Sequence, residues 1–366
     1  MIYLDNGATS FVKPGAVPRA IIKAMRTCAN PGRGGYPAAM EAARTVYRCR
    51  ENAAALFDCT PEQVVFTGSC TQGLNIAIRT LVKPGDRVVI SGFEHNAVTR
   101  TLHGIGAQII VAGEKLFDRQ DTLDSFAKVL KTGVQAAVFL HVSNVFGYVL
   151  PVEEMAELCR KYRVPFILDA AQSAGTYPIN LKKLGASFIA MPGHKGLLGP
   201  QGTGILLCAE DPIPLFYGGT GSESLRQEMP EIMPDRLEAG TLNVPGIAGL
   251  NQGLSYLRGV GLKQIREREH RQALRCAEGL KQLGYSVFSG ENQAGTVSFV
   301  PKIDCEEAAA RLGERGVAVR AGLHCAPLAH KSAGTLETGT VRVSFGLDAS
   351  DLQTDAFLRA AEICCG

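Results

Sequence analysis

The chain has 366 residues, of which 46% are hydrophobic and 20% charged, a composition typical of a globular protein large enough for more than one domain. Its formal net charge of +3 is too small to indicate binding to nucleic acid or to an anionic membrane surface. Met1 leads directly into an apolar segment without the pattern of a signal peptide, and no apolar run is long enough to span a membrane, so we expect a cytoplasmic protein.

Strand-like and helical segments alternate from residue 64 onward. Helical patterns cover residues 71–81 and 96–102. The strand-like segments are residues 64–67, 87–90, 108–111, 136–140, 166–168, 187–189 and 204–207. Because strands that alternate with helices form largely parallel sheets covered on both faces, we expect an α/β domain.

The pattern changes after about residue 261. A helical stretch that starts within 237–253 is followed by a helix at 265–283, a strand at 295–299, a helix at 306–316 and a strand at 340–345. These segments predict a smaller α+β domain, which the first residues of the chain join. We therefore expect a large domain at 13–255 and a small domain made of 1–12 and 256–366.

The 11 cysteines are scattered along the chain, and none forms a C-x-x-C pair. This spacing argues against a structural zinc site, so we expect no metal. An odd number of cysteines in a long chain also argues against a secreted disulfide scaffold. We expect most of them to be reduced residues that fill the core, and we assign no function to the vicinal pair Cys364–Cys365.

Lys195 follows the apolar segment 186–190 in a turn rich in glycine. A lysine held in a constrained loop at the end of a strand can lose its hydration, which lowers its pKa and frees the amine to form a Schiff base. Taken alone, the motif favours the alternative, a solvated surface lysine in a flexible loop, because most lysines are solvated.

Asp169 ends a second apolar segment, residues 164–168. A carboxylate at the end of a buried strand needs a partner, and ligands bind at strand ends in open α/β sheets. A lysine that forms a Schiff base and an aspartate that can hold a protonated pyridine nitrogen are the minimum that an enzyme needs to use pyridoxal 5′-phosphate (PLP).

With these motifs, the sequence resembles the fold-type-I PLP enzymes of the class-V aminotransferase group, and within that group the cysteine desulfurases and selenocysteine lyases. The matching segments run from residues 3–9 to residues 341–345, nearly the whole chain. The resemblance implies a large domain with a mostly parallel seven-stranded sheet flanked by helices, a smaller α+β domain, and a homodimer.

The segment 66–71 precedes a predicted helix. Its small residues and the helix N-terminus favour an anion such as the cofactor phosphate, although capping of the helix by Ser69 or Thr71 explains them too, and both can hold together. The resemblance places the backbone of Cys70 and the hydroxyl of Thr71 on the phosphate, where relatives usually have alanine or threonine at position 70. Many relatives also have a phosphate-binding serine where this chain has Pro192, so we expect Ser69 to compensate.

The resemblance assigns roles to five further residues. It implies that His95 stacks on the pyridine ring and moves protons, that Asn144 lies near the phenolate oxygen and the substrate carboxylate, and that Gln172 binds the same phenolate oxygen. It also implies that His194 reaches the phosphate and that Thr241 binds the phosphate of the neighbouring subunit. A hydrogen-bonded histidine at a helix start and an ordinary turn before a helix are the alternatives for His95 and Thr241.

Cys325 lies in a loop with a histidine and an arginine nearby, surroundings that can stabilise a thiolate. The spacing Arg-x-Gly-x-His-Cys-Ala resembles the short catalytic loop of group II cysteine desulfurases. The alternative is that Cys325 is one more structural cysteine. Arg342 resembles the arginine that binds the substrate carboxylate bidentately. The alternative is a charge on an edge strand, but its flanking valines indicate a partly buried guanidinium that requires an anion.

These roles predict a PLP-dependent cysteine desulfurase that converts L-cysteine to L-alanine. Lys195 holds the cofactor and moves the α-proton, Asp169 keeps the ring nitrogen protonated, and Cys325 takes the sulfur as a persulfide for an acceptor protein or thiol. A selenocysteine lyase acting on L-selenocysteine would share every one of these residues. A class-V aminotransferase, lyase or epimerase would not need Cys325, and a catalytically silent scaffold would need none of them.

Overall fold

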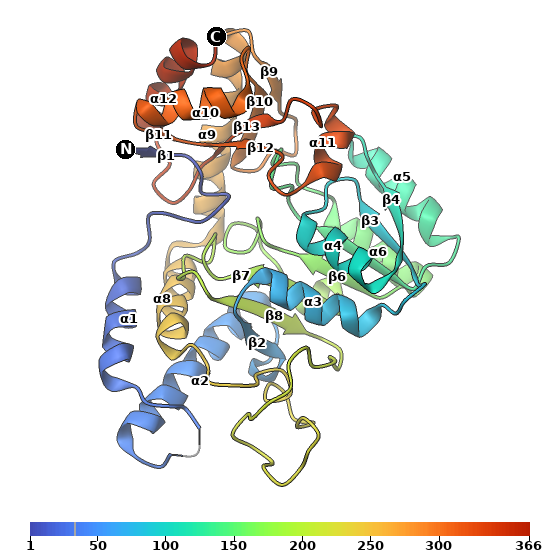
Figure 1. Cartoon of the computed structure of the whole chain (residues 1–366), viewed down its shortest axis with the longest axis vertical. Helices are drawn as coiled ribbons and strands as arrows, with labels where there is room; N and C mark the ends of the chain where they lie inside the picture. Colours follow the sequence, from blue (N-terminus) through green and yellow to red (C-terminus); the bar gives the residue numbers. More distant parts are fainter. Residues whose placement is uncertain (33) are drawn as a thin grey trace.

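A seven-stranded sheet forms the centre of the larger part of the protein (Figure 1). The computed structural model describes residues 1–32 and 34–366. The strands are β2 (Val64–Thr67), β3 (Arg87–Ser91), β4 (Gln108–Ala112), β5 (Ala136–Leu140), β6 (Phe166–Asp169), β7 (Phe188–Pro192) and β8 (Gly204–Cys208). Their order is β2-β8-β7-β6-β5-β3-β4, and β8 alone runs antiparallel to the other six strands. The predicted mostly parallel seven-stranded sheet is confirmed.

Helices cover both faces of this sheet, because its central strands are apolar on both sides. Phe139 and Leu168 pack into the core under α2, α5, α6 and α8, whereas their neighbours Val138 and Ile167 pack against α3 and α4. The helices are α1 (Ala16–Thr27), α2 (Pro37–Phe57), α3 (Cys70–Leu81), α4 (Asn96–Ile105), α5 (Arg119–Leu130), α6 (Val152–Tyr162), α7 (Leu181–Leu184) and α8 (Val244–Val260), with a short 3₁₀ turn at Pro61–Gln63. Within the described residues, no helix is both long and apolar enough to cross a membrane.

A smaller antiparallel sheet, in the order β12-β13-β10-β9, lies at the top of Figure 1 with its own apolar core. It is built from β9 (Ser286–Phe288), β10 (Thr296–Val300), β12 (Arg320–Gly322) and β13 (Thr340–Ser344), with α9 (Leu262–Gln282), α10 (Cys305–Glu314) and α12 (Asp351–Cys364). Helix α11 (Pro327–Ala333) packs instead against the core of the larger part. The N-terminal strand β1 (Ile2–Tyr3) pairs in parallel with β11 (Val317–Ala318). The domain boundary after residue 255 stays a prediction.

One detail differs from the sequence-based expectations, namely the extent of the strand before Lys195. The strand before Lys195 runs from Phe188 through Pro192, because Pro192 lies at its last register position, opposite Gly204. The helical stretch expected to start within residues 237–253 is α8, which begins at Val244 and is preceded by residues 237–243. They end a long irregular segment, residues 209–243, which projects from the bottom of the molecule in Figure 1.

Candidate active site

A cavity of about 580 Å³ opens at the carboxyl ends of β5, β6 and β7. This is the edge where ligands bind in open α/β sheets. Most of the predicted site residues line it: Ser69, Cys70, Thr71, His95, Asn144, Asp169, Gln172, His194 and Lys195. The fold therefore brings together residues that are up to 126 positions apart in the sequence (195 − 69).

Lys195 is held in its loop by glycines on both sides. A Cβ atom on Gly193 would lie 2.1 Å from the Thr203 hydroxyl, and one on Gly196 would lie 2.3 Å from the carbonyl oxygen of Ala174, so neither position accepts a side chain. Burial, reinforced by the positive charge of Arg342, lowers the pKa of Lys195 from 10.5 to about 8. The amine is thus poised to lose its proton near neutral pH, as Schiff-base formation requires.

Asp169 is the last residue of β6 and is only 4% exposed. Its Oδ1 atom accepts a hydrogen bond from the backbone N–H of Ala171 at 2.8 Å and one from the thiol of Cys70 at 3.6 Å. In the described part of the chain, no group donates to Oδ2. Oδ1 thus has two hydrogen-bond donors, whereas Oδ2 is free to accept one more. A buried carboxylate of this kind is suited to bind a protonated pyridine nitrogen in the cavity.

Helix α3 begins at one end of the cavity. Ser69 is its N-cap, and the Ser69 hydroxyl accepts a hydrogen bond from the Gln72 backbone N–H at 3.2 Å. The capping alternative is therefore confirmed for Ser69. The free backbone N–H groups of the first turn remain suited to an anion, since capping and anion binding use the same geometry.

His95 is the N-cap of α4. Its Nδ1 atom accepts the backbone N–H of Ala97 at 3.0 Å, so the proton of the neutral ring lies on Nε2. Burial lowers the pKa of His95, while the negative charge of Asp169 acts in the opposite direction. His95 can therefore cap α4 and also stack on the cofactor ring, because capping uses only its Nδ1 atom.

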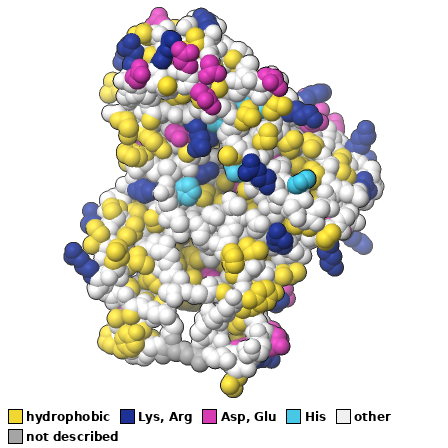
Figure 2. Space-filling model, viewed as in Figure 1, with side chains coloured by type: hydrophobic (Ala, Val, Ile, Leu, Met, Phe, Trp, Pro, Cys, Tyr) yellow, Lys and Arg dark blue, Asp and Glu magenta, His cyan; other side chains and the backbone are white. Residues whose placement is uncertain are grey.

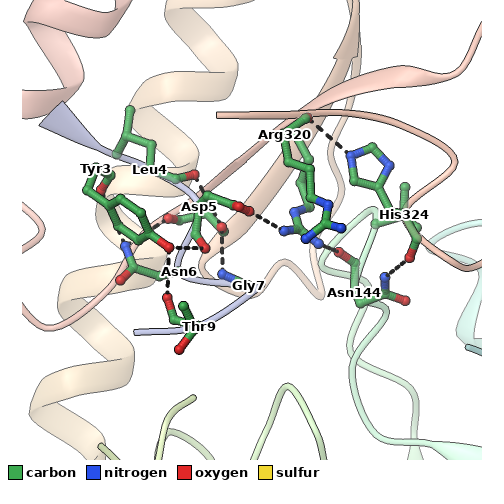
Figure 3. Close-up of polar contacts among 12 residues, drawn as sticks. Tyr3, Leu4, Asp5, Asn6, Gly7, Thr9, Asn144, Arg320 and His324 are labelled. Atoms are coloured by element: carbon green, nitrogen blue, oxygen red, sulfur yellow. Dashed lines mark hydrogen bonds and ion pairs between the residues drawn. The ribbon is translucent and has the colours of Figure 1, made fainter. Parts of the chain in front are cut away.

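Arg342 is 3% exposed on β13, a strand that lies between β12 and β10. The edge-strand alternative is therefore wrong. Its Nη2 atom donates to Asp5 and its Nη1 atom to the carbonyl of Asn144 at 3.1 Å, while Nε has no partner in the described residues. Asp5 comes from the N-terminal segment, whose labelled residues lie together in Figure 3. The buried arginine has its expected anion, but that anion comes from the chain itself.

Asn144 connects this arginine to the loop that carries Cys325. Its Nδ2 atom donates to the carbonyl of His324 at 2.8 Å, and its buried Oδ1 atom has no partner in the described residues (Figure 3). The amide donor expected to reach a phenolate or a carboxylate is thus engaged with the backbone in this structure. The uncommitted oxygen is available to a donor group of a ligand.

Two other predicted residues join the cavity to the N-terminal segment. The Gln172 side chain donates to the carbonyl of Gly7 at 2.9 Å, and His194 Nδ1 lies 3.0 Å from the Thr9 hydroxyl. Burial, assisted by the charge of Lys195, lowers the pKa of His194 to about 4, so its ring is neutral at pH 7. A phosphate there would accept a hydrogen bond from this ring and would not meet a full positive charge.

Cys325 is exposed and lies beside the cavity, outside its lining. His324 and Cys325 have φ values of 51° and 56°, an uncommon conformation for residues with side chains. The Cys325 carbonyl accepts the backbone N–H of Asn96 at 2.7 Å, which fixes the loop next to His95. Burial and then the charge of Arg342 lower the pKa of His324 to about 3. His324 is therefore neutral at pH 7 and supplies no positive charge to a thiolate at Cys325.

Comparison with known proteins identifies the family. Residues 2–357 match the family model of the class-V aminotransferases. The chain belongs to this family. A probable cysteine desulfurase from Pyrococcus abyssi is 31% identical, in an alignment that covers 99% of this chain and 94% of the relative. The solved structure of a cysteine desulfurase from Thermococcus onnurineus NA1 is 32% identical with a TM-score of 0.92, covering 100% of this chain and 94% of the other. The Escherichia coli cysteine desulfurase CsdA, at 24% identity and a TM-score of 0.86, covers 99% and 94% and shares the fold.

Thr241 lies apart from the cavity that surrounds Lys195 in this class-V chain. It is exposed in the irregular segment 209–243 and lines a separate cavity of about 680 Å³ that also contacts Gly68 and Thr203. Within one subunit, Thr241 therefore does not join the other predicted cofactor residues. Its expected role concerns a neighbouring subunit and stays a prediction.

Two acidic residues of the site were not singled out from the sequence. Asp5 lies in the matching segment 3–9, which was the available signal for its role. Glu94 precedes His95 and is completely buried; its Oε1 atom accepts the hydroxyl of Ser91 and the backbone N–H of Leu140. Burial raises the pKa of Glu94 to about 8, so this side chain is a neutral acid at pH 7 that connects β3 to β5 behind the cavity.

Proposed function

We propose that the protein is a PLP-dependent cysteine desulfurase, which converts L-cysteine to L-alanine and leaves the sulfur as a persulfide on Cys325. The observation that carries the proposal is the combination of the enclosed amine of Lys195 with the uncommitted oxygen of Asp169 in one cavity, next to an exposed cysteine. The similarity to cysteine desulfurases over the full chain supports the same activity.

The residues present fit the cofactor. Lys195 would hold it covalently, Asp169 Oδ2 would accept the proton of its ring nitrogen, and the first turn of α3 with Ser69 and Thr71 would bind its phosphate. When bound, PLP withdraws electrons from the substrate carbon atoms. Burial of Asp169 would help to keep the ring nitrogen protonated, because an oriented charge interacts far more strongly in a site of low dielectric than in water.

The substrate carboxylate would bind Arg342, whose Nε atom is uncommitted. Asp5 already neutralises part of this charge, so the substrate competes with an internal carboxylate instead of meeting an unpaired buried arginine. Lys195, with its lowered pKa, can take up the α-proton near neutral pH and return it. His95 lines the same cavity and can donate a proton from Nε2.

Cys325 would accept the sulfur atom. A bond forms between Cys325 Sγ and the substrate sulfur while the carbon–sulfur bond of cysteine breaks, and the bonding pair stays with carbon. The carbon takes up a proton and becomes the methyl group of alanine, so sulfur is oxidised and carbon is reduced. Because Cys325 is exposed, an acceptor protein or a thiol can reach the persulfide.

The proposal includes a homodimer in which Thr241 serves the partner's cofactor. Figure 2 shows hydrophobic side chains over the lower half of the molecule, the part that holds α1, α2 and segment 209–243. The exposed apolar residues there are Ile22, Met25, Tyr36, Met40, Tyr47, Phe216, Tyr217, Leu225 and Ile232. A surface of this kind is typical of a subunit interface.

The test is to incubate the purified protein with L-cysteine and a reductant and to measure sulfide and alanine. We expect equal amounts of both, and neither from Lys195→Ala. A keto acid or pyruvate in place of alanine would instead support a class-V aminotransferase or lyase that leaves Cys325 unused. A protein that binds no PLP and forms neither product would support a scaffold.

A further inference from the structure

We propose that the Cys70 thiol is a positioning residue that holds the Asp169 carboxylate in one orientation, with Oδ2 directed to the cofactor ring. The inference rests on the proposed PLP site but concerns a contact within the chain itself. It gives a role to a buried cysteine that the reaction at Cys325 does not use.

The geometry at Asp169 is asymmetric. Cys70 is the first residue of α3 and is 9% exposed, and its Sγ atom lies 3.6 Å from Oδ1 of Asp169. The backbone N–H of Ala171 donates to the same oxygen at 2.8 Å. A single hydrogen bond fixes the position of Oδ1 but still allows the plane of the carboxylate to rotate about that bond. A second donor, from a different element, fixes the plane as well.

The thiol is suited to act as a donor and not as a charge. Burial and the neighbouring Asp169 raise the pKa of Cys70 well above its ordinary value, so the sulfur keeps its proton at neutral pH. A thiol is a weak donor, so it orients the carboxylate without drawing much charge from it. Asp169 thus remains a strong partner for a protonated ring nitrogen at Oδ2.

A simple filling role is the alternative, because Cys70 also belongs to the apolar core that includes Leu74 and Ala190. The two roles make opposite predictions for substitution. If Cys70 only fills space, Cys70→Ala is the milder change and Cys70→Ser the worse one, since serine would bury a hydroxyl. If Cys70 positions Asp169, serine keeps a donor and alanine does not.

The first experiment measures the S–H stretching band by infrared difference spectroscopy on the cofactor-free protein. Subtracting the spectrum of Cys70→Ala isolates the Cys70 band, which we expect at the low frequency of a hydrogen-bonded thiol. In the Asp169→Ala background this band should shift to higher frequency. The band of Cys208, a buried cysteine of the same core, is isolated with Cys208→Ala and should not move. A Cys70 band that is unaffected by Asp169→Ala would overturn the proposal.

The second experiment uses the protein loaded with PLP. Cys70→Ala should shift the pH titration of the visible absorption band and lower kcat about tenfold, as expected for a lost hydrogen bond to a charged group, and Cys70→Ser should restore both. An unchanged titration in Cys70→Ala, or greater damage in Cys70→Ser, would contradict the positioning role. Because the infrared readout needs neither cofactor nor substrate, it stands even if the protein acts on a substrate other than cysteine.

Discussion

Replacing Lys195 with methionine should remove a rise in the stability of the cofactor-free protein at alkaline pH. The pKa of Lys195 falls from 10.5 in the unfolded chain to about 8 in the folded protein, mainly through burial. Between these two values the unfolded chain holds a proton that the folded protein has released, so folding becomes more favourable as the pH rises. Below about 8 both states are charged at this position, and above 10.5 both are neutral.

The size of the effect follows from the difference between the two pKa values. One pKa unit corresponds to about 1.4 kcal/mol, so the free energy of unfolding should gain about 3 kcal/mol from Lys195 across this pH range. The assay is urea denaturation of the cofactor-free protein at several pH values from 7 to 10.5, compared with Lys195→Met. The matched control is Lys263→Met, a lysine on α9 whose side chain is 79% exposed. A pH dependence in Lys195→Met that equals the wild-type dependence would show that the amine is not buried as described.

Three further substitutions test other contacts of the site. Asp169→Asn should retain some cofactor but lose about 100-fold or more in kcat, because an amide cannot stabilise a protonated ring nitrogen; near-normal kinetics would remove Asp169 from the mechanism. Thr241→Ala should release cofactor faster on dilution if the site is shared between subunits, whereas a monomer with full activity would exclude a shared site. Asp5→Ala should lower the free energy of unfolding by about 3 kcal/mol in urea denaturation, because it leaves Arg342 buried without a carboxylate. An unchanged urea midpoint would mean that the Asp5–Arg342 pair contributes nothing to stability.

The central sheet was predictable because strands buried on both faces read as short apolar runs. The same runs located Lys195 and Asp169, since each residue follows directly on such a run and strand ends meet at one edge of a parallel sheet. The exact end of β7 was not predictable, because a proline is normally unfavourable in a strand and Pro192 is tolerated only at its last position.

The polar partners of the site could not be derived from local sequence. Arg342 pairs with Asp5 across 337 positions, and Cys70 contacts Asp169 across 99 positions, so both contacts exist only once the fold has formed. The neutral state of His324 could not be read from the sequence for a similar reason: burial and the nearby Arg342 lower its pKa, and both depend on the fold.

The central claim is that Cys325 accepts sulfur from L-cysteine, and mass spectrometry of the protein after exposure to cysteine tests it directly. We expect the mass of one added sulfur atom on the peptide that contains Cys325. The variant Cys325→Ala should still bind PLP and L-cysteine but should release no sulfide from cysteine, although residual reaction with selenocysteine is compatible because selenium leaves more readily. Sulfur found instead on Cys70 or on Cys364–Cys365, or desulfuration by Cys325→Ala at the wild-type rate, would contradict the proposed reaction.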